Sequence, residues 1–224
     1  MCTRFCRYEL RTTNVAAASE FYASVLGRRD LIIRELPVSA RARGAPAHWL
    51  GYLSTAALGG SLRVLQRWNA QGAMPIGARM GDGAVVRDPG GAMLALTDSS
   101  ELVDAGVALH VLHTPHAASA AQIYVELFGW VLTEKLELGA LGSFQQFAWR
   151  TGEPTAGSIV DLAGRPDVHP QWQYFFAVNS LDSALQSVRS LGGSVIGPTE
   201  LPNGSRVAAC DDPQGAAFGV IEQA

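Results

Sequence analysis

Residues 49–75 read WLGYLSTAALGGSLRVLQRWNAQGAMP, and residues 172–198 repeat them in outline as WQYFFAVNSLDSALQSVRSLGGSVIGP. The opening Trp and the closing Pro of the two copies are separated by the same interval of 123 positions (172 − 49 and 198 − 75). Downstream, Asp88-Pro89-Gly90-Gly91 recurs as Asp212-Pro213-Gln214-Gly215. Similarity at a fixed spacing indicates a duplicated architecture, so we expect two related halves.

The same order of secondary structure is predicted in both halves. Residues 5–12 alternate like a half-buried strand, Asn14 can cap the helix that follows, and Gly27 can end that helix before another strand. This order recurs over residues 109–134. A second strand and helix then lead, in each half, to short strands joined by the Asp-Pro turns. The pattern predicts an α+β fold with domains at residues 1–103 and 104–224.

Composition and charge exclude several classes of protein. The 224 residues are 48 % hydrophobic, which is enough for a substantial core. The net charge of −3 predicts no nucleic acid partner, because binding to phosphates needs clustered Lys and Arg. No apolar run reaches the ~20 residues of a membrane span, and Arg4 and Arg7 interrupt a signal-like start, so we expect a cytoplasmic protein with no membrane partner. Three cysteines without paired spacing predict neither a disulfide framework nor a structural zinc site.

The chain resembles the vicinal oxygen chelate superfamily, which includes glyoxalase I, extradiol dioxygenases, and bleomycin and fosfomycin resistance proteins. The resemblance rests on TTNVAAASEFYASVLG, on HTPHAASAAQIYVELFGW, on the two repeated stretches quoted above and on the two Asp-Pro turns. The two-domain form, with the words ELRTT and DPQGA, is most similar to actinobacterial antigen-like proteins labelled as hydroxylases. The resemblance implies four βαβββ modules that form two cupped mixed sheets, whose concave faces hold small molecules.

The first module is expected to be shortened by about two strands. From Gly27 to Trp49 there are 22 positions (49 − 27), whereas from Gly129 to Trp172 there are 43 (172 − 129). The difference of 21 residues is enough for two strands and their turns. We therefore expect the N-terminal cup to be open on one side.

No resident metal or other cofactor is predicted. The resemblance implies three kinds of metal ligand: a His or Glu on a first strand, a His on the strand that opens another module, and a terminal Glu near the end of a final strand. In this chain the first kind falls at Arg7 and Leu109, the second at Leu50 and Gln173, and the terminal Glu at Ala95 and Gly219. None of them is a good ligand for a divalent cation. The evenly spaced His110, His113 and His116 offer an alternative, but residues three apart on a strand face opposite ways. We expect His110 to face the helix, His113 the cup, and His116 the helix cap, although a one-residue shift of the alignment would put His110 at a ligand position.

The resemblance also assigns side chains to the concave faces. On the first strand these are Arg7, Glu9 and Arg11, where two cations could bind an anionic or polar ligand and hold Glu9 ionised as a general base. An internal ion-pair ladder is the alternative for these three residues. The C-terminal face is mostly apolar around His113, Gln173 and Phe175, which suits a flat aromatic ligand, with filling of the core as the alternative. In the first half the corresponding ligand-binding candidates are Tyr52 and Met93.

Two functions remain open from the sequence. The first is metal-independent binding of a small aromatic or natural-product-like molecule. The second is an enzyme, such as a hydroxylase, isomerase or cyclase, acting on a secondary metabolite through Glu9 or His113. Metal-dependent lyase or dioxygenase chemistry is disfavoured by the residues at the ligand positions. No nucleotide-binding, zinc-protease or nucleophile-elbow motif occurs, the glycine-rich turn at residues 77–83 lacks the following helix that a phosphate site needs, and a homodimer is left open.

Overall fold

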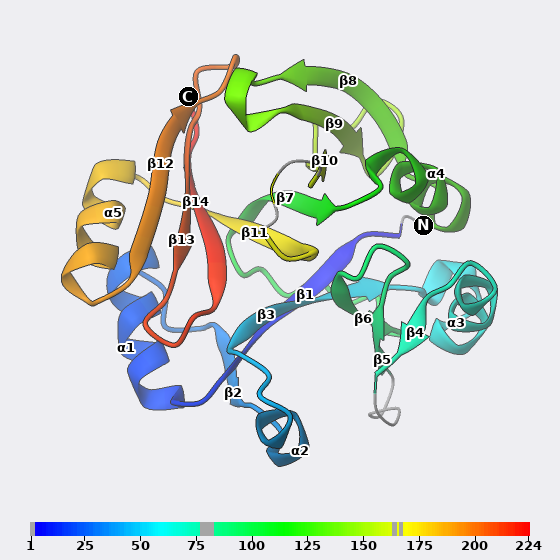
Figure 1. Ribbon diagram of the computed structural model, residues 1–224, viewed down its shortest axis with the longest axis horizontal. Helices are drawn as coiled ribbons and strands as arrows, with labels where there is room; N and C mark the ends of the chain where they lie inside the picture. Colours follow the sequence, from blue (N-terminus) through cyan, green and yellow to red (C-terminus); the bar gives the residue numbers. More distant parts are fainter. Residues whose placement is uncertain (1–2, 77–82, 163–164, 166–167) are drawn as a thin grey trace. The chain divides into compact units, whose positions relative to one another are not determined.

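A computed structural model describes residues 3–76, 83–162, 165 and 168–224 (Figure 1). Most of the glycine-rich turn at residues 77–83 lies outside these ranges. The first half contains β1 (Phe5–Thr12), α1 (Val15–Leu26), β2 (Ile32–Glu35), α2 (Val38–Ala42), β3 (His48–Ser54), η1 (Ala56–Leu58), α3 (Ser61–Asn69), β4 (Met74–Pro75), β5 (Gly83–Arg87) and β6 (Met93–Thr97). The second half contains β7 (Val107–Thr114), α4 (Ala117–Phe128), β8 (Val131–Glu137), η2 (Gly139–Leu141), β9 (Ser143–Ala148), β10 (Gly157–Asp161), β11 (Gln171–Ala177), α5 (Leu181–Ser190), β12 (Ser194–Glu200), β13 (Arg206–Asp211) and β14 (Ala217–Glu222).

The strands form two curled mixed sheets. A six-stranded sheet has the order β2-β1-β3-β6-β5-β4, and an eight-stranded sheet has the order β12-β13-β14-β11-β7-β10-β9-β8. Each sheet contains parallel pairs, such as β3 with β6 and β11 with β14, and antiparallel pairs, such as β5 with β6 and β13 with β14. The predicted α+β class with tandem modules is confirmed.

The shortened first module is also confirmed. Between α1 and β3 the chain forms only the four-residue strand β2 and the short helix α2. Between α4 and β11 it forms β8, β9 and β10, which are hydrogen-bonded to one another. The six-stranded sheet therefore has two strands fewer than its eight-stranded counterpart.

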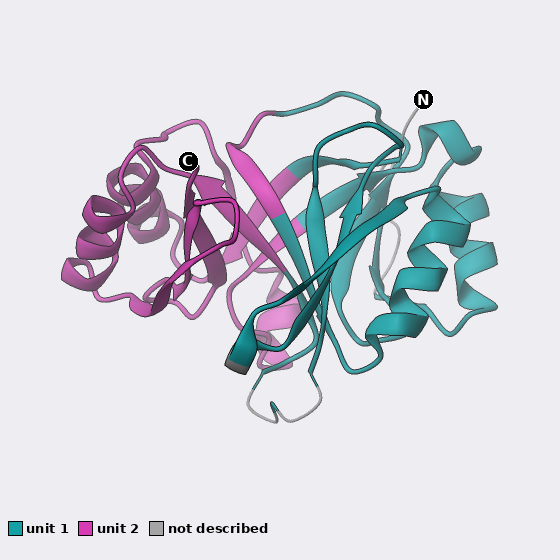
Figure 2. Cartoon of the chain, turned by 90° about the horizontal axis from the view of Figure 1, so that it is seen from above, with its two compact units in different colours: residues 1–7, 51–103, 110–172 teal, residues 8–50, 104–109, 173–224 magenta. Residues whose placement is uncertain are grey.

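By contacts, the chain divides into two compact units, and each takes segments from both halves of the sequence (Figure 2). Unit 1 comprises residues 1–7, 51–103 and 110–172, and unit 2 comprises residues 8–50, 104–109 and 173–224. The division into domains at residues 1–103 and 104–224 stays a prediction.

Each unit contains the same buried chain of hydrogen bonds. In unit 1, Trp172 Nε1 donates to the Tyr124 hydroxyl at 3.1 Å, and that hydroxyl donates to Asp88 Oδ2 at 3.1 Å. Asp88 Oδ1 accepts from the Ala92 amide at 2.8 Å, which closes the Asp-Pro turn. Burial raises the pKa of Asp88, and these hydrogen bonds oppose the increase. The helix tyrosine of unit 1 therefore holds the turn in place.

In unit 2 the corresponding chain runs from Trp49 to Tyr22 to Asp212. Trp49 Nε1 donates to the Tyr22 hydroxyl at 2.9 Å, and Tyr22 donates to Asp212 Oδ2 at 3.2 Å. Burial raises the pKa of Tyr22 well above its ordinary value, and the neighbouring Asp212 adds to the increase. The tyrosine stays neutral and acts as a hydrogen-bonding core residue.

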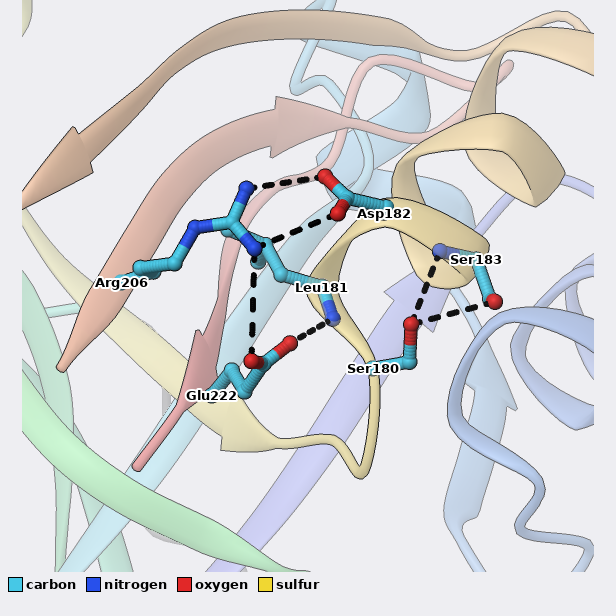
Figure 3. Close-up of polar contacts among 6 residues, drawn as sticks. All are labelled: Ser180, Leu181, Asp182, Ser183, Arg206 and Glu222. Carbon is cyan, nitrogen blue, oxygen red and sulfur yellow. Dashed lines mark hydrogen bonds and ion pairs between the residues drawn. The ribbon is translucent and has the colours of Figure 1, made fainter. Parts of the chain in front are cut away.

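Helix ends follow the expected chemistry. Asn14 accepts a hydrogen bond from the Ala17 amide at 3.0 Å, and Gly27 has the left-handed φ of +66° that a C-terminal cap favours. At α5, Glu222 accepts from the Leu181 amide at 2.5 Å, and Arg206 binds Asp182 in the first turn of the helix (Figure 3). Both carboxylates lie where the helix dipole favours negative charge.

Candidate functional site

In unit 2 the carboxylate of Glu9 lies between two arginines. Glu9 Oε1 is 2.6 Å from Arg11 Nη2 and 3.2 Å from Arg34 Nε, and the Glu9 side chain is 4 % exposed. The parallel pairing of β1 with β2 places Arg11 directly opposite Arg34, so both guanidinium groups reach the same carboxylate. The structure thus brings the predicted residues Glu9 and Arg11 together and adds Arg34. Both guanidinium groups are paired with this one buried carboxylate, which favours the ion-pair alternative for Glu9 and Arg11.

His48 belongs to the same unit and is the first residue of β3. Burial lowers the pKa of its imidazole; the Pro46 carbonyl, 2.9 Å from Nδ1, opposes this change, and the charge of Arg11 adds to it. A neutral imidazole near a cation can accept a hydrogen bond or a proton from a ligand. His48 is therefore a further polar group of this region.

In unit 1 Arg7 lies over the ring of Tyr52, with its guanidinium carbon 3.8 Å from the ring centroid. This is a cation–π contact, and it makes Tyr52 a platform that orients the arginine. Tyr52 is buried and pairs directly with Ala95 of β6. Met93, half-buried, lies two residues earlier on β6 and on the same face as Ala95. Three predicted ligand-binding residues of the first half, Arg7, Tyr52 and Met93, thus lie on neighbouring strands.

In unit 2 the ring of Phe175 covers Gly219. The two residues are direct partners in the pairing of β11 with β14, and a Cβ built on Gly219 would overlap the Phe175 ring. Gln173 is buried, and its Nε2 donates to the Phe218 carbonyl at 2.9 Å. Phe175 is 7 % exposed, so most of its surface is packed within the protein.

The evenly spaced trio of His110, His113 and His116 lies in unit 1, where each ring has different surroundings. His110 is buried, its ring stacks on Phe5 with centroids 5.3 Å apart, and its Nδ1 lies 2.7 Å from the Ala156 carbonyl. Burial lowers the pKa of His110 to about 4. His113 is half-buried on β7, opposite Val160 of β10. His116 occupies the N-cap position of α4, as the sequence predicts.

The donor set does not suit a divalent metal ion. Of the six inherited ligand positions, only Gln173 carries an oxygen or nitrogen donor other than a cationic guanidinium, and its amide is buried against the Phe218 carbonyl. The place of the terminal ligand beside Gly219 is filled by Phe175. Within the described ranges no group of three His, Cys, Asp or Glu side chains has a suitable arrangement for a metal ion. The metal implied by the fold therefore finds no fitting set of residues at these positions.

Sequence reasoning missed Arg34. Arg34 follows an apolar pair, Ile32 and Ile33, in a strand, and its contact with Glu9 depends on the register between β1 and β2. The alternation of arginines with Glu9 was a signal for a charged cluster, but the register between β1 and β2 cannot be read from one sequence.

The part of the chain that the structure describes contains no helix long and apolar enough to cross a membrane.

The chain belongs to the Glyoxalase/Bleomycin resistance protein/Dioxygenase superfamily, whose family model matches residues 107–220, just over half of the sequence. Among proteins with assigned names, it is 25 % identical to the anthracycline biosynthesis protein DnrV of Streptomyces peucetius, over 96 % of this chain and 91 % of that protein. It is 24 % identical to CFP32 of Mycobacterium tuberculosis, whose name gives glyoxylase as a provisional assignment, over 96 % of this chain and 93 % of that protein.

Solved structures share the fold. Homoprotocatechuate 2,3-dioxygenase from Brevibacterium fuscum, in complex with 3,4-dihydroxyphenylacetate, superimposes with a TM-score of 0.64 at 16 % identity, covering 99 % of this chain and 81 % of that one. The Mn(II)-bound glyoxalase from Novosphingobium aromaticivorans gives a TM-score of 0.62 at 12 % identity, covering 99 % and 82 %. At these identities the likeness concerns the fold alone.

Proposed function

We propose that this protein binds a small aromatic, natural-product-like molecule without a resident metal ion. The observation that carries the proposal is repeated in both halves: an aromatic ring faces a small residue where the superfamily places its terminal carboxylate ligand. Tyr52 pairs with Ala95, and Phe175 pairs with Gly219. An aromatic side chain thus stands beside each position where the superfamily has its terminal carboxylate, and aromatic rings favour recognition of a flat ligand by contact area.

A polar group beside the Tyr52 ring can orient a bound ligand. Arg7 is held over Tyr52, so its charge is positioned close to an aromatic surface. An arginine in this setting can pair with a phenolate, a carboxylate or a quinone oxygen of a ligand, and its hydrogen bond to a charged group is stronger than one between neutral groups. The combination suits an aromatic ligand that carries acidic or carbonyl oxygens.

The named relatives support the same class of ligand. DnrV is described as an anthracycline biosynthesis protein and matches over nearly the whole chain. DauV of Streptomyces sp. strain C5, also described as an anthracycline biosynthesis protein, is 32 % identical over 49 % of this chain and 44 % of that protein. We extend from them only the chemical class, a polycyclic aromatic metabolite.

Titration with a dihydroxyanthraquinone is expected to quench the tryptophan fluorescence of the full chain in a saturable way. The five tryptophans are reporters, and chelation of divalent cations should leave the dissociation constant unchanged. Arg7→Gln should weaken binding roughly tenfold, because it removes a charge-assisted contact. Arg29→Gln is the matched control, since that side chain is 79 % exposed and lies 3.8 Å from Glu20.

Two results would overturn the proposal. A flat response across a broad panel of polycyclic quinones and phenols would remove the ligand class. Near-stoichiometric Mn, Fe, Ni or Zn in protein purified without an affinity tag, together with loss of binding on chelation, would remove the metal-independent part.

An enzyme is the second candidate, and His48 favours it, because burial and the charge of Arg11 both lower the pKa of its imidazole and it belongs to the same unit as Glu9. Glu9→Gln should abolish conversion of the substrate while dihydroxyanthraquinone binding changes by less than about twofold, because a general base acts on the proton and not on binding. Arg34→Gln is the control, since it weakens the same ion-pair cluster and keeps the carboxylate. Conversion would be followed by mass spectrometry of the quinone panel, and equal turnover by Glu9→Gln and the parent protein would exclude Glu9 as the base.

A further inference from the structure

Unit 1 contains a hollow of about 250 Å³ that is separate from the residues discussed above. Its lining includes Arg4, Ser54, Ser100, Leu102, Arg150 and Glu153. Pockets for drug-sized ligands usually measure ~300–1,000 Å³, so this hollow is too small for a polycyclic molecule. Its lining is mixed, with cationic, hydroxyl and apolar groups, and such a lining suits a small polar metabolite.

Backbone hydrogen bonds hold the lining segments together. The Arg4 carbonyl accepts from the Ser54 amide at 3.0 Å, which joins the start of β1 to the end of β3. The Cys6 carbonyl accepts from the Val103 amide at 2.8 Å, so the segment after β6 runs beside β1. The Cys6 thiol, which also lines the hollow, donates to the Tyr52 carbonyl at 3.4 Å. The wall formed by β1 and β3 is therefore defined by the fold.

Another part of the lining comes from the turn between β9 and β10. Arg150 and Glu153 belong to this turn, and the Glu153 amide donates to the Arg150 carbonyl at 3.2 Å. Arg150 is exposed, whereas Arg4 and Glu153 are half-buried. The two arginines are 146 positions apart in the sequence (150 − 4), and the fold brings both to one hollow.

The charges of this hollow are not balanced. Among residues 3–76, 83–162, 165 and 168–224, neither Arg4 nor Arg150 has a carboxylate oxygen within the 4.0 Å of an ion pair. Two guanidinium groups and one carboxylate leave one excess positive charge. A bound anion would relieve the repulsion between the arginines and gain charge-assisted hydrogen bonds.

We propose that this hollow binds a small oxyanion, either the carboxylate or the phosphate of a metabolite much smaller than a polycyclic ligand. Arg4 and Arg150 bind the anionic oxygens, and the hydroxyl groups of Ser54 and Ser100 can donate to them. Leu102 covers the apolar part of the molecule. Glu153 accepts from a hydroxyl group at its other end.

The test is calorimetric titration of the full chain at low ionic strength with inorganic phosphate in one arm and pyruvate in the other. Saturable binding in either arm is expected, and the tighter arm identifies the oxyanion. Arg150→Gln should weaken binding roughly tenfold, the typical effect of losing one hydrogen bond to a charged group. Glu153→Gln should tighten binding because it removes the opposing charge. Arg87→Gln, at an exposed site of unit 1 outside the lining, should change nothing.

Arg150 lies in an exposed turn, so its substitution tests the hollow even if an Arg4 variant does not fold. Absence of saturable binding in both arms at 10 mM ligand, a concentration of about ten times a typical millimolar dissociation constant, would overturn the proposal. Equal weakening by Arg87→Gln, or weaker binding after Glu153→Gln, would also overturn it. The anthraquinone titration uses another ligand and other variants, so failure of one proposal is distinguishable from failure of the other.

Discussion

Replacement of Gly219 by Glu is expected to lower the free energy of unfolding by at least about 3 kcal/mol. The substitution restores the carboxylate that the superfamily carries at this position. A Cβ at residue 219 would overlap the Phe175 ring. Because Phe175 is only 7 % exposed, the new carboxylate beside it would be largely buried. Overpacking and burial of an unpaired charge both destabilise the folded state.

A double-mutant cycle separates the steric cause from the charge. In the Phe175→Ala background, Gly219→Glu should cost less than half of its effect in the parent protein, because the ring that obstructs it is gone. Ala217→Glu is the matched control for added charge, since this half-buried residue lies on the same face of β14 two positions earlier. Urea denaturation measures all variants. If the Gly219→Glu protein were as stable as the parent protein, Phe175 would not fill the space beside residue 219.

The second large effect concerns pH. His110 has a folded-state pKa of about 4, below its ordinary value of 6.5, because burial disfavours the charged imidazolium. The unfolded chain therefore binds a proton between these two values while the folded protein does not. Stability from this group is fully present above pH 6.5 and is lost as the pH falls toward about 4, a loss of roughly 3 kcal/mol for a 2.5-unit difference.

His110→Phe should remove this pH dependence. The Ala156 carbonyl would keep its hydrogen bond from the backbone amide of residue 110, at 3.1 Å, and a phenyl ring could keep the stack on Phe5. Urea denaturation from pH 7 to pH 4 should show the parent losing about 3 kcal/mol relative to the variant. Since burial raises the pKa of Asp88 and of Asp212, those carboxyls contribute in the opposite direction in both proteins and cancel in the comparison. If the free energies of unfolding of the two proteins changed in parallel from pH 7 to pH 4, His110 would not be the source of this pH dependence.

The architecture was predictable from the sequence because it depends on repeated local signals. Asn14 and Gly27 mark a helix in any context, and the interval from Gly27 to Trp49 is too short for the missing strands. Tyr22 and Tyr124 lie at matching places in the two helices, and both are buried. Their shared chain of Trp, Tyr and Asp could not be derived, since its partners are up to 190 positions apart.

The candidate site was only partly predictable. Alternation along β1 put Arg7, Glu9 and Arg11 on one face, and the structure pairs Glu9 with Arg11 and places Arg7 over Tyr52. The second partner of Glu9, Arg34, depends on how β2 pairs with β1. Gly219 was identified as a position that cannot bind a metal, whereas the covering ring of Phe175 follows from the register between β11 and β14. Registers between strands arise from tertiary packing and turn geometry, which a single sequence does not encode locally.

The shortened first module also has a consequence for self-association. Without the two additional strands, β2 forms one border of the six-stranded sheet. It is four residues long and ends with the exposed pair Arg34 and Glu35. Short, charged border strands resist the addition of a strand from another molecule, which protects against aggregation. The edge strand that remains in the shortened module is therefore unfavourable for amyloid-like pairing between molecules.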